Sequence, residues 1–381
     1  MSQSIKEKRV KKYAALESLR GLAALLVTLF HFNFVVSEKL PIIAQGDIFV
    51  DFFFVLSGFV VAHAYADRVI AKMSFRDFLL LRIGRLYPLH IFILFIWVPY
   101  ILGKYVIFSQ VGMGSDPSDE NNFFSFGLNL LLLQSYGLDD SLSWNGPAWS
   151  ISVEMGAYLM FFALVAFFRK IPSRFVFPIV SIGCYALLFS LVGDTLLRTY
   201  DYGIIRCAGG FFTGAALRMW TVGYNWNPSK TTATIFEILS LSAMLLFVSQ
   251  IAGSITFEIL SFTSFVFVIA IFSLQEKGLI SDLLNFRFAV YLGTISYSIY
   301  MVHAIFAFAS LDFAIYVLKM PTTPESGVKL VTTPYAPLLM IIYLTVIVLL
   351  SHFTFNWIEK PFRDRMKNYV KKKKVTELSI T

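Results

Sequence analysis

The sequence carries little charge for its length. Of its 381 residues, 15% are Asp, Glu, Lys or Arg, 57% are hydrophobic and the mean hydropathy is +0.69, whereas soluble domains hold roughly 25% charged residues. This balance excludes a soluble enzyme or a secreted disulfide scaffold. Apolar runs of about 20 residues, long enough to cross a bilayer, recur along nearly the whole sequence, so the composition indicates a membrane protein with many spans.

Cysteine is scarce and several catalytic motifs are missing. The two cysteines, Cys184 and Cys207, lie in apolar segments and are expected to be small buried residues, neither a disulfide nor a metal pair. The sequence has no HxxxxD box, HExxH or Cys/His zinc pattern, GxSxG elbow, Walker A loop or GxGxxG turn. A metal-dependent or nucleotide-hydrolysing mechanism is therefore unsupported, and we expect neither a metal nor a permanently bound cofactor.

The apolar runs predict an all-α fold, a polytopic membrane helix bundle of about ten transmembrane helices. The predicted spans cover residues 14–36, 46–66, 86–108, 148–168, 174–193, 202–220, 232–250, 254–274, 290–318 and 334–357. The apolar segment FFSFGLNLLLLQSYGL, residues 123–138, is short, and we expect it to be re-entrant or interfacial. The first run lacks a convincing cleavage site and is expected to remain as a helix.

Basic residues cluster beside the spans and predict their orientation. The chain begins with KEKRVKK at 6–12 and ends with KKKK at 371–374, while the connection at 115–122 is acidic. By the positive-inside rule, both termini are expected in the cytoplasm and the protein in the inner cell membrane. The net charge of +8 is thus explained by topology, without nucleic acid. We predict three parts: a basic N-terminus (1–12), a membrane domain (13–363) and a basic tail (364–381).

Ionisable residues inside a membrane are costly and are candidates for function. Arg20 and His31 are eleven residues apart on the first predicted helix, so they share one face about 16 Å apart along the axis. An Arg near the cytoplasmic end suits a phosphate or carbonyl, and a His suits proton abstraction. The alternative is an anchoring Arg and a packing His.

A second pair of bases precedes the third predicted span. Arg82 and Arg85 lie three residues apart in LLLRIGRLYPLH, and paired guanidinium groups bind phosphate well. The alternative is ordinary positive-inside decoration. His90, just inside the span, is interpreted as structural.

Further polar residues interrupt the spans. Glu154 follows Ser150 and Ser152 in WSISVEM and is a candidate to orient a base or bind an acceptor hydroxyl, with a buried salt bridge as the alternative. Asp51 lines a polar cavity or pairs with Arg20 or Arg206, and the sequence does not choose. Together with His303 in SYSIYMVH, Asp51 and Arg206 are candidates for substrate binding.

Six motifs occur in an order typical of one family: LESLRGLAALLVTLFHF, FVDFFFVLSGF, RIGRLYP, SWNGPAWSISVE, LGTISYSIYMVH and WIEKP. From about residue 13 to residue 363 the chain resembles the acyltransferase-3 family. These are integral membrane acyltransferases, such as those that O-acetylate lipopolysaccharide, exopolysaccharide and peptidoglycan.

The resemblance implies transfer of an acyl group from cytoplasmic acyl-CoA, usually acetyl-CoA, to a hydroxyl group, commonly of a sugar on the outer side. Arg20 and His31 match the family's Arg-His pair. Arg82 and Arg85 match its Arg-x-x-Arg motif, and Glu154 matches the acid of its Trp-Ser-x-x-x-Glu element. The chain ends shortly after the last predicted helix, so we expect any second transfer step to need another protein.

Together these observations predict a membrane O-acyltransferase with a carbohydrate or glycolipid acceptor. Arg20, Arg82 and Arg85 would hold acyl-CoA, and His31 would either deprotonate the acceptor or be transiently acylated. Glu154, and also Asp51, would orient His31 or the acceptor. Two alternatives are a transporter or flippase for a lipid-linked sugar and a structural subunit of a polysaccharide synthase. The acceptor, the acyl length and the oligomeric state are not indicated by the sequence.

Overall fold

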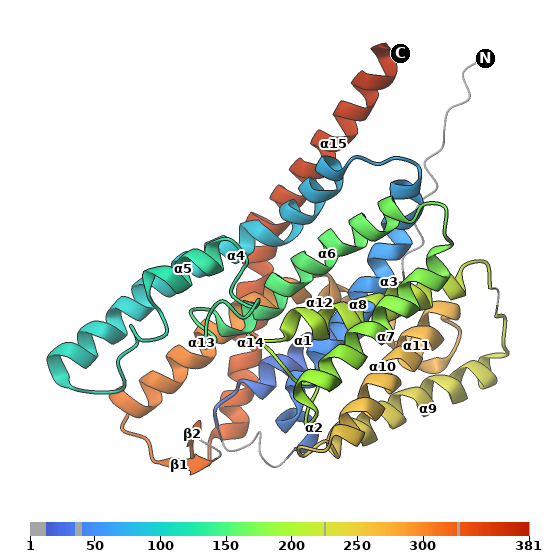
Figure 1. Cartoon of the computed structure of the whole chain (residues 1–381). Helices are drawn as coiled ribbons and strands as arrows, with labels where there is room; N and C mark the ends of the chain where they lie inside the picture. Colours follow the sequence, from blue (N-terminus) through green and yellow to red (C-terminus); the bar gives the residue numbers. More distant parts are fainter. Residues whose placement is uncertain (1–12, 35–39, 225, 326–327, 381) are drawn as a thin grey trace.

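The computed structural model describes residues 13–34, 40–224, 226–325 and 328–380, and these form a helical bundle with one small hairpin (Figure 1). The helices are α1 (Ala14–Phe30), α2 (Pro41–Ala44), α3 (Phe49–Ile70), α4 (Phe75–Val111), α5 (Phe123–Leu130), α6 (Trp149–Phe167), α7 (Ser173–Val192), α8 (Gly203–Thr221), α9 (Lys230–Ser249), α10 (Ile255–Leu274), α11 (Leu279–Leu284), α12 (Arg287–Thr294), α13 (Ser296–Asp312), α14 (Ala336–Thr354) and α15 (Lys360–Ile380). The hairpin pairs β1 (Thr322–Glu325) with β2 (Val328–Val331) in antiparallel fashion. The predicted basic N-terminus lies outside the described residues.

Eight helical stretches of the described chain have the length and apolar composition to cross a membrane. They are Gly46–Ile70, Phe75–Val111, Gly146–Phe167, Ser173–Val192, Lys230–Ser249, Ile255–Leu274, Ser296–Val317 and Ala336–Lys373. The expected multi-pass helical bundle is therefore present. α1, which has 17 residues, and α8 coincide with the two other predicted spans, and their crossing stays a prediction, as does the side on which the termini lie.

Three helix boundaries differ from the prediction. α1 ends at Phe30, so His31 is the residue that terminates the helix and does not lie within it. α4 begins at Phe75 and holds Arg82 and Arg85 inside a continuous helix of 37 residues, not in a connection before one. The predicted span 290–318 is broken at Ile295, between α12 and α13. These differences arise because hydropathy detects apolar runs, whereas a helix continues through polar residues that find partners.

The segment between α4 and α6 does not cross the membrane as a helix. α5 has eight residues, about 12 Å of helix, far less than a bilayer core. It is fixed to α4 by two hydrogen bonds: Tyr87 donates to the Leu130 carbonyl at 2.9 Å and His90 Nε2 donates to the Asn129 carbonyl at 2.8 Å. The expectation of a re-entrant or interfacial segment agrees with this geometry, and His90 has the structural role expected.

Glycine permits the closest helix crossing, between α3 and α8. A Cβ atom on Gly58 would lie 1.8 Å from the Phe211 carbonyl oxygen, and one on Gly214 would lie 1.7 Å from that of Val55. Small residues of this kind allow backbones to meet in membrane bundles, where van der Waals contact drives association. Both cysteines are free. Cys207 is buried on α8 within this core, as predicted, whereas Cys184 on α7 is only partly buried.

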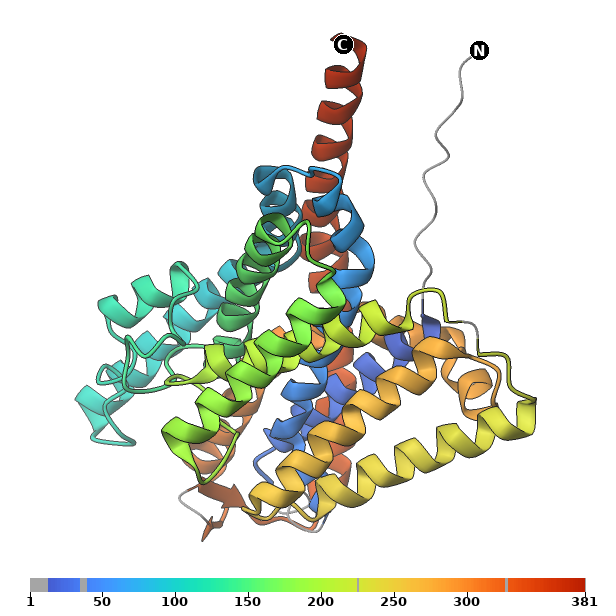
Figure 2. The same cartoon turned by 45° about the vertical axis from the view of Figure 1, so that its right-hand side comes forward.

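The remaining helices surround this crossing. α7 packs on α8, and α9 and α10 lie side by side at one edge of the bundle (Figure 2). α14 leads through the π-helical turn Phe355–Glu359 into α15, which projects beyond the bundle (Figures 1 and 2). The predicted basic tail therefore belongs to a helix that continues from the membrane domain.

The α3–α8 crossing generates a prediction about stability. We expect Gly214→Ala to lower the free energy of unfolding by about 1–3 kcal/mol, because the added methyl group forces the backbones of α3 and α8 apart. The matched control is Gly183→Ala on α7, where an added Cβ meets no atom within 4 Å and alanine should stabilise the helix by roughly 0.5–1 kcal/mol. Thermal unfolding of the purified variants in one detergent measures the difference. Equal melting temperatures for the two variants would contradict the close crossing.

Candidate active site

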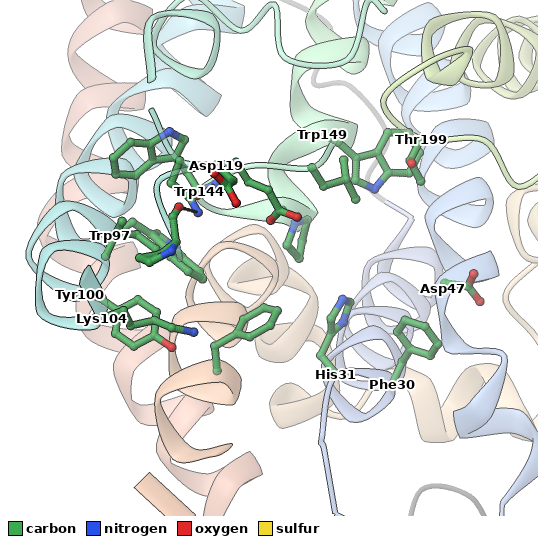
Figure 3. Close-up of a pocket in the computed structure, with 18 of the residues that line it drawn as sticks. Phe30, His31, Asp47, Trp97, Tyr100, Lys104, Asp119, Trp144, Trp149 and Thr199 are labelled. Atoms are coloured by element: carbon green, nitrogen blue, oxygen red, sulfur yellow. Dashed lines mark hydrogen bonds between the residues drawn. The ribbon is translucent and has the colours of Figure 1, made fainter. Parts of the chain in front are cut away.

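A cavity of about 520 Å³ opens beside the C-terminal end of α1 (Figure 3). His31 and Phe30 lie on one side of it, and Trp97, Tyr100 and Lys104 of α4 lie on another. Its remaining lining includes Val27, Asp47, Val50, Ile101, Asp116, Asp119, Glu120, Asn121, Leu142, Trp144, Pro147, Trp149, Thr199, Arg206, Tyr300 and Phe308. We call it the outer cavity, since the acidic loop at 115–122, which follows α4, is a connection expected outside.

His31 presents one nitrogen as a base. Its Nδ1 lies 2.9 Å from the Val27 carbonyl oxygen, one helical turn earlier. Because a carbonyl can only accept, Nδ1 carries the proton and Nε2 keeps its lone pair. The end of α1 thus fixes the tautomer, and the position of His31 after the last helical residue turns its ring toward the outer cavity.

A second histidine, His303, lies against the ring of His31. His303 Nε2 lies 3.3 Å from His31 Nδ1, and the two ring centroids are 4.8 Å apart. His303 is fully buried and is not part of the cavity lining. The structure places His303 behind His31, in contact with its ring, and the predicted role of His303 in substrate binding stays a prediction.

A smaller hollow, of about 80 Å³, lies nearer the other end of α1. Its polar lining is Arg20, Ser57, Arg85, Ser150, Glu154, Ser296, Tyr297 and Tyr300, and its apolar lining includes Val50, Phe53, Phe54, Leu56, Val60, Val61, Leu86 and Ile151. We call it the inner pocket. Arg20 and Arg85, which the sequence assigned to acyl-CoA binding from separate motifs, meet here.

Arg20 is held at the break between α12 and α13. Its Nε donates to Ser296 Oγ at 2.8 Å, and its NH2 group donates to the Gly293 carbonyl at 2.6 Å and to Glu17 at 2.7 Å. The Gly293 carbonyl can accept this bond because it lies in the last turn of α12, where the helix ends and carbonyl groups lose their usual helical partners. Gly293 also lets α12 touch α1, since a Cβ there would lie 1.8 Å from the Glu17 carbonyl oxygen.

Glu154 belongs to the inner pocket. Ser57 and Tyr158 each donate a hydrogen bond of 2.5 Å to its Oε1 atom, and Glu154 does not line the outer cavity. Within the described residues, no hydrogen bond or ion pair joins it to His31. The structure thus places this carboxylate beside Arg85 and Arg20, and the expectation that it orients His31 directly finds no contact to carry it.

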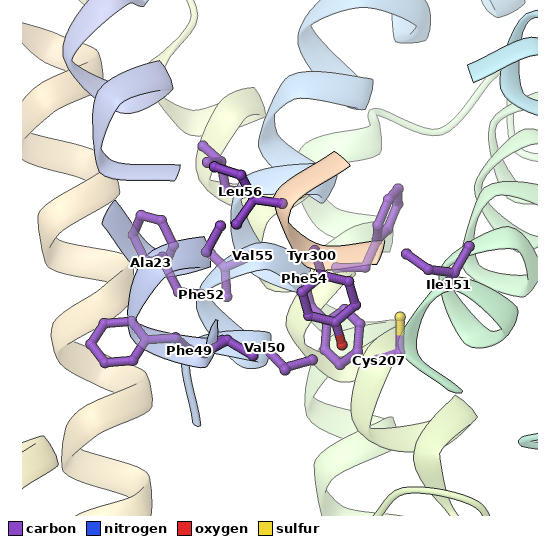
Figure 4. Packing of buried hydrophobic residues seen from close by; sticks show 14 of the residues in the cluster. Ala23, Phe49, Val50, Phe52, Phe54, Val55, Leu56, Ile151, Cys207 and Tyr300 are labelled. Atoms are coloured by element: carbon purple, nitrogen blue, oxygen red, sulfur yellow. The ribbon is translucent and has the colours of Figure 1, made fainter. Parts of the chain in front are cut away.

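The two hollows share a wall, formed by Tyr300 and Val50, which line both. Figure 4 shows these two residues among the packed hydrophobic side chains of the core. Tyr300 donates to the Pro147 carbonyl at 2.8 Å and accepts from Ser150 at 2.8 Å, and its ring lies 5.6 Å from that of His303. Arg85 and Lys104 on α4 mark the two hollows and are 19 residues apart, about 28 Å along a helix. The hollows therefore follow one another along the direction in which α4 would cross a bilayer.

Two residues that were predicted to bind substrate, Asp51 and Arg206, pair with each other, and their role in substrate binding stays a prediction. Arg206 forms a bidentate ion pair with Asp51, at 3.0 Å and 2.6 Å, and also donates to the Arg198 carbonyl. This settles the alternative that the sequence left open between Arg20 and Arg206. Arg206 still lines the outer cavity, whereas Asp51 lines neither hollow.

Arg82 does not join Arg85. It is buried, donates to the Tyr65 hydroxyl at 2.5 Å, and stacks over the rings of Tyr65 and Tyr158 at 4.5 Å and 5.4 Å. Like Asp51, it lines neither hollow. The Arg-x-x-Arg pair therefore divides between the core and the inner pocket in this structure.

Several lining residues were not predicted from the sequence. Tyr300, Ser296 and Ser57 lie inside quoted motifs, but a single sequence does not show which motif positions face a cavity. The aromatic residues Trp97 and Trp144 are indistinguishable by composition from the many other aromatic residues of the spans. The hydroxyl-rich pattern SYSIY, residues 296–300, is the signal that could have indicated a polar helix face.

The sequence matches a known protein family over most of its length. The model of the acyltransferase domain family (Acyl_transf_3) matches residues 13–357. No solved structure matches the chain.

Three curated relatives are similar to the chain. The putative peptidoglycan O-acetyltransferase YrhL of Bacillus subtilis is 27% identical over 92% of this chain and 55% of its own length, and the peptidoglycan O-acetyltransferase OatA of Listeria monocytogenes is 24% identical over 77% and 49%. The acyltransferase MdmB of Streptomyces mycarofaciens is 33% identical over 44% and 42%. The chain thus spans about half the length of these relatives. Since the family model covers nearly all of the sequence, the chain belongs to the acyltransferase-3 family of membrane acyltransferases.

Proposed function

We propose that this protein moves an acetyl group from cytoplasmic acetyl-CoA to a hydroxyl group of a carbohydrate or glycolipid on the outer side of the inner cell membrane. The observation that carries the proposal is the pair of hollows that share Tyr300 and Val50. One hollow presents two guanidinium groups and the other presents a histidine with a free nitrogen. A donor rich in phosphate and an acceptor hydroxyl need these different surfaces.

The inner pocket suits the donor. Arg20 and Arg85 are always charged and bind phosphate and carbonyl oxygens well. Glu154 and Ser57 line the same hollow, where the carboxylate of Glu154 attracts Arg85 electrostatically. Acetyl-CoA would enter from the cytoplasmic mouth, with its thioester directed toward Tyr300 and Val50.

The outer cavity suits the reaction. The acceptor oxygen attacks the thioester carbonyl carbon, the new C–O bond forms and the C–S bond breaks. Nε2 of His31 takes the hydroxyl proton and returns it to the departing CoA thiolate. Transient acylation of His31 would use the same nitrogen. His303 and the Val27 carbonyl keep the ring oriented through Nδ1.

The role of His31 can be tested by transfer of radiolabelled acetyl from acetyl-CoA into extractable glycan in inside-out membrane vesicles. We expect His31→Gln to lower the rate by at least about 100-fold, since a positioned base contributes about 10²–10⁴-fold. The matched control is His352→Gln on α14, which lines neither hollow and should retain wild-type transfer. Label retained on the wild-type protein itself would identify an acyl-His31 intermediate. Undiminished transfer by His31→Gln at equal expression would refute the proposal.

The donor site can be tested separately. We expect Arg85→Gln to raise the KM for acetyl-CoA by about tenfold or more, because a hydrogen bond to a charged group contributes about 1.5–3 kcal/mol. Arg76→Gln is the matched control, since Arg76 lies exposed on the same helix, outside both hollows. Initial rates against acetyl-CoA concentration measure the effect. An equal KM for the two variants would mean that the inner pocket does not hold the donor.

A further inference from the structure

The charged residues of the outer cavity are unequally compensated. Its lining contains two cations, Lys104 and Arg206, besides His31. Lys104 pairs with Asp312 at 3.2 Å, and Arg206 pairs with Asp51 at 2.6 Å. Neither of these acids lines the cavity, so each cation is neutralised from behind the wall.

The lining contains four acids, Asp47, Asp116, Asp119 and Glu120. Arg206 attracts Asp47, but the three acids of the loop at 115–122 are not neutralised in this way. Hydrogen bonds from the side chain and backbone of Ser118 lower the pKa of Asp116, which keeps its carboxyl group charged. Across the described residues, the side chains of Asp119 and Glu120 form neither a hydrogen bond nor an ion pair. The cavity therefore presents net negative charge to whatever enters it.

The same cavity has an aromatic surface with a spare donor. Trp97, Tyr100, Trp144 and Trp149 line it (Figure 3). Trp97 is 3% exposed, and its Nε1 has no hydrogen-bond partner among the described residues. A buried donor without a partner costs free energy unless a ligand or water accepts from it. Aromatic rings cover the apolar faces of ligands and attract cations over their faces.

We propose that the outer cavity selects its acceptor by charge, and that it binds a glycan with protonated amino groups more tightly than a neutral glycan and a neutral glycan more tightly than one with carboxylate groups. This inference rests on the proposed function, because it assigns the class of acceptor that the cavity takes. Asp119 and Glu120 attract the ammonium groups, the aromatic residues cover the sugar rings, and Trp97 donates to a sugar oxygen. Sugars rich in carboxylates are repelled.

Binding can be measured without catalysis. Full-length protein in nanodiscs is titrated with three probes of equal length: the trisaccharide of glucosamine, maltotriose and trigalacturonic acid. Tryptophan emission reports occupancy, because three tryptophans line the cavity. In low salt we expect the glucosamine probe to bind about threefold to tenfold more tightly than maltotriose, as expected for two solvent-accessible carboxylates, and added salt should reduce this preference.

Paired variants locate the effect. We expect the variant Asp119→Asn with Glu120→Gln to lose the preference for the glucosamine probe. The matched control, Asp139→Asn with Asp140→Asn, neutralises an adjacent acidic pair that lies outside the lining and should keep it. Equal affinities for all three probes, no saturable binding, or an equal effect of both variants would overturn the inference. Acetyl transfer in vesicles is measured separately, so that the two proposals can fail independently. Acetyl transfer together with equal affinities for the three probes would refute only this inference. Charge-selective binding without acetyl transfer would refute the proposed function.

Discussion

A cation inside a membrane domain needs partners that the protein itself supplies, and Arg20 finds them where α12 ends and α13 begins. Its hydrogen bonds to Ser296 and Gly293 join the first helix of the chain to a helix break more than 270 residues later. α13 then carries Tyr300 and His303, four and seven residues after Ser296, on one helical face. The hydrogen bonds of Arg20 to Ser296 and Gly293 therefore also help to position Tyr300 in the shared wall and His303 behind His31.

The opposite side of the site depends on backbone contact between α3 and α8. Gly58 and Gly214 bring these helices together, and the Asp51–Arg206 pair closes the crossing with two hydrogen bonds. Breaking such a buried pair from one side leaves a charge without a partner, which costs far more than the pair contributes. Asp51 thus acts on the cavity indirectly, by holding Arg206 in its wall while cancelling its charge.

Most of the long helices could be predicted from the sequence because an apolar run is a local signal. The spacing of Arg20 and His31 also singled them out, although His31 ends α1 and the two residues line different hollows. A run of apolar residues is visible in a window of 20, and an eleven-residue spacing defines a face without knowledge of any partner. The sequence is least informative where the position of a side chain depends on segments far away in the chain. The break at Ile295, the separation of Arg82 from Arg85, and the assignment of Glu154 to the inner pocket all follow from contacts between residues far apart in the chain. Spacing alone could not choose a partner for Asp51, because Arg20 and Arg206 were equally plausible until the fold placed α8 against α3.

The proposed function gives the division of the site into two hollows a chemical reason. Two guanidinium groups near His31 would favour its neutral form, but they would also attract an anionic acceptor and compete for the donor's phosphates. With Arg20 and Arg85 on one side of Tyr300 and the acids of the loop at 115–122 on the other, each of the two proposed substrates would meet a surface of opposite charge. In the proposed function, only the thioester end of the donor would have to reach past Tyr300 and Val50. The acyl group would then cross between the two hollows while the rest of each substrate stays on its own side.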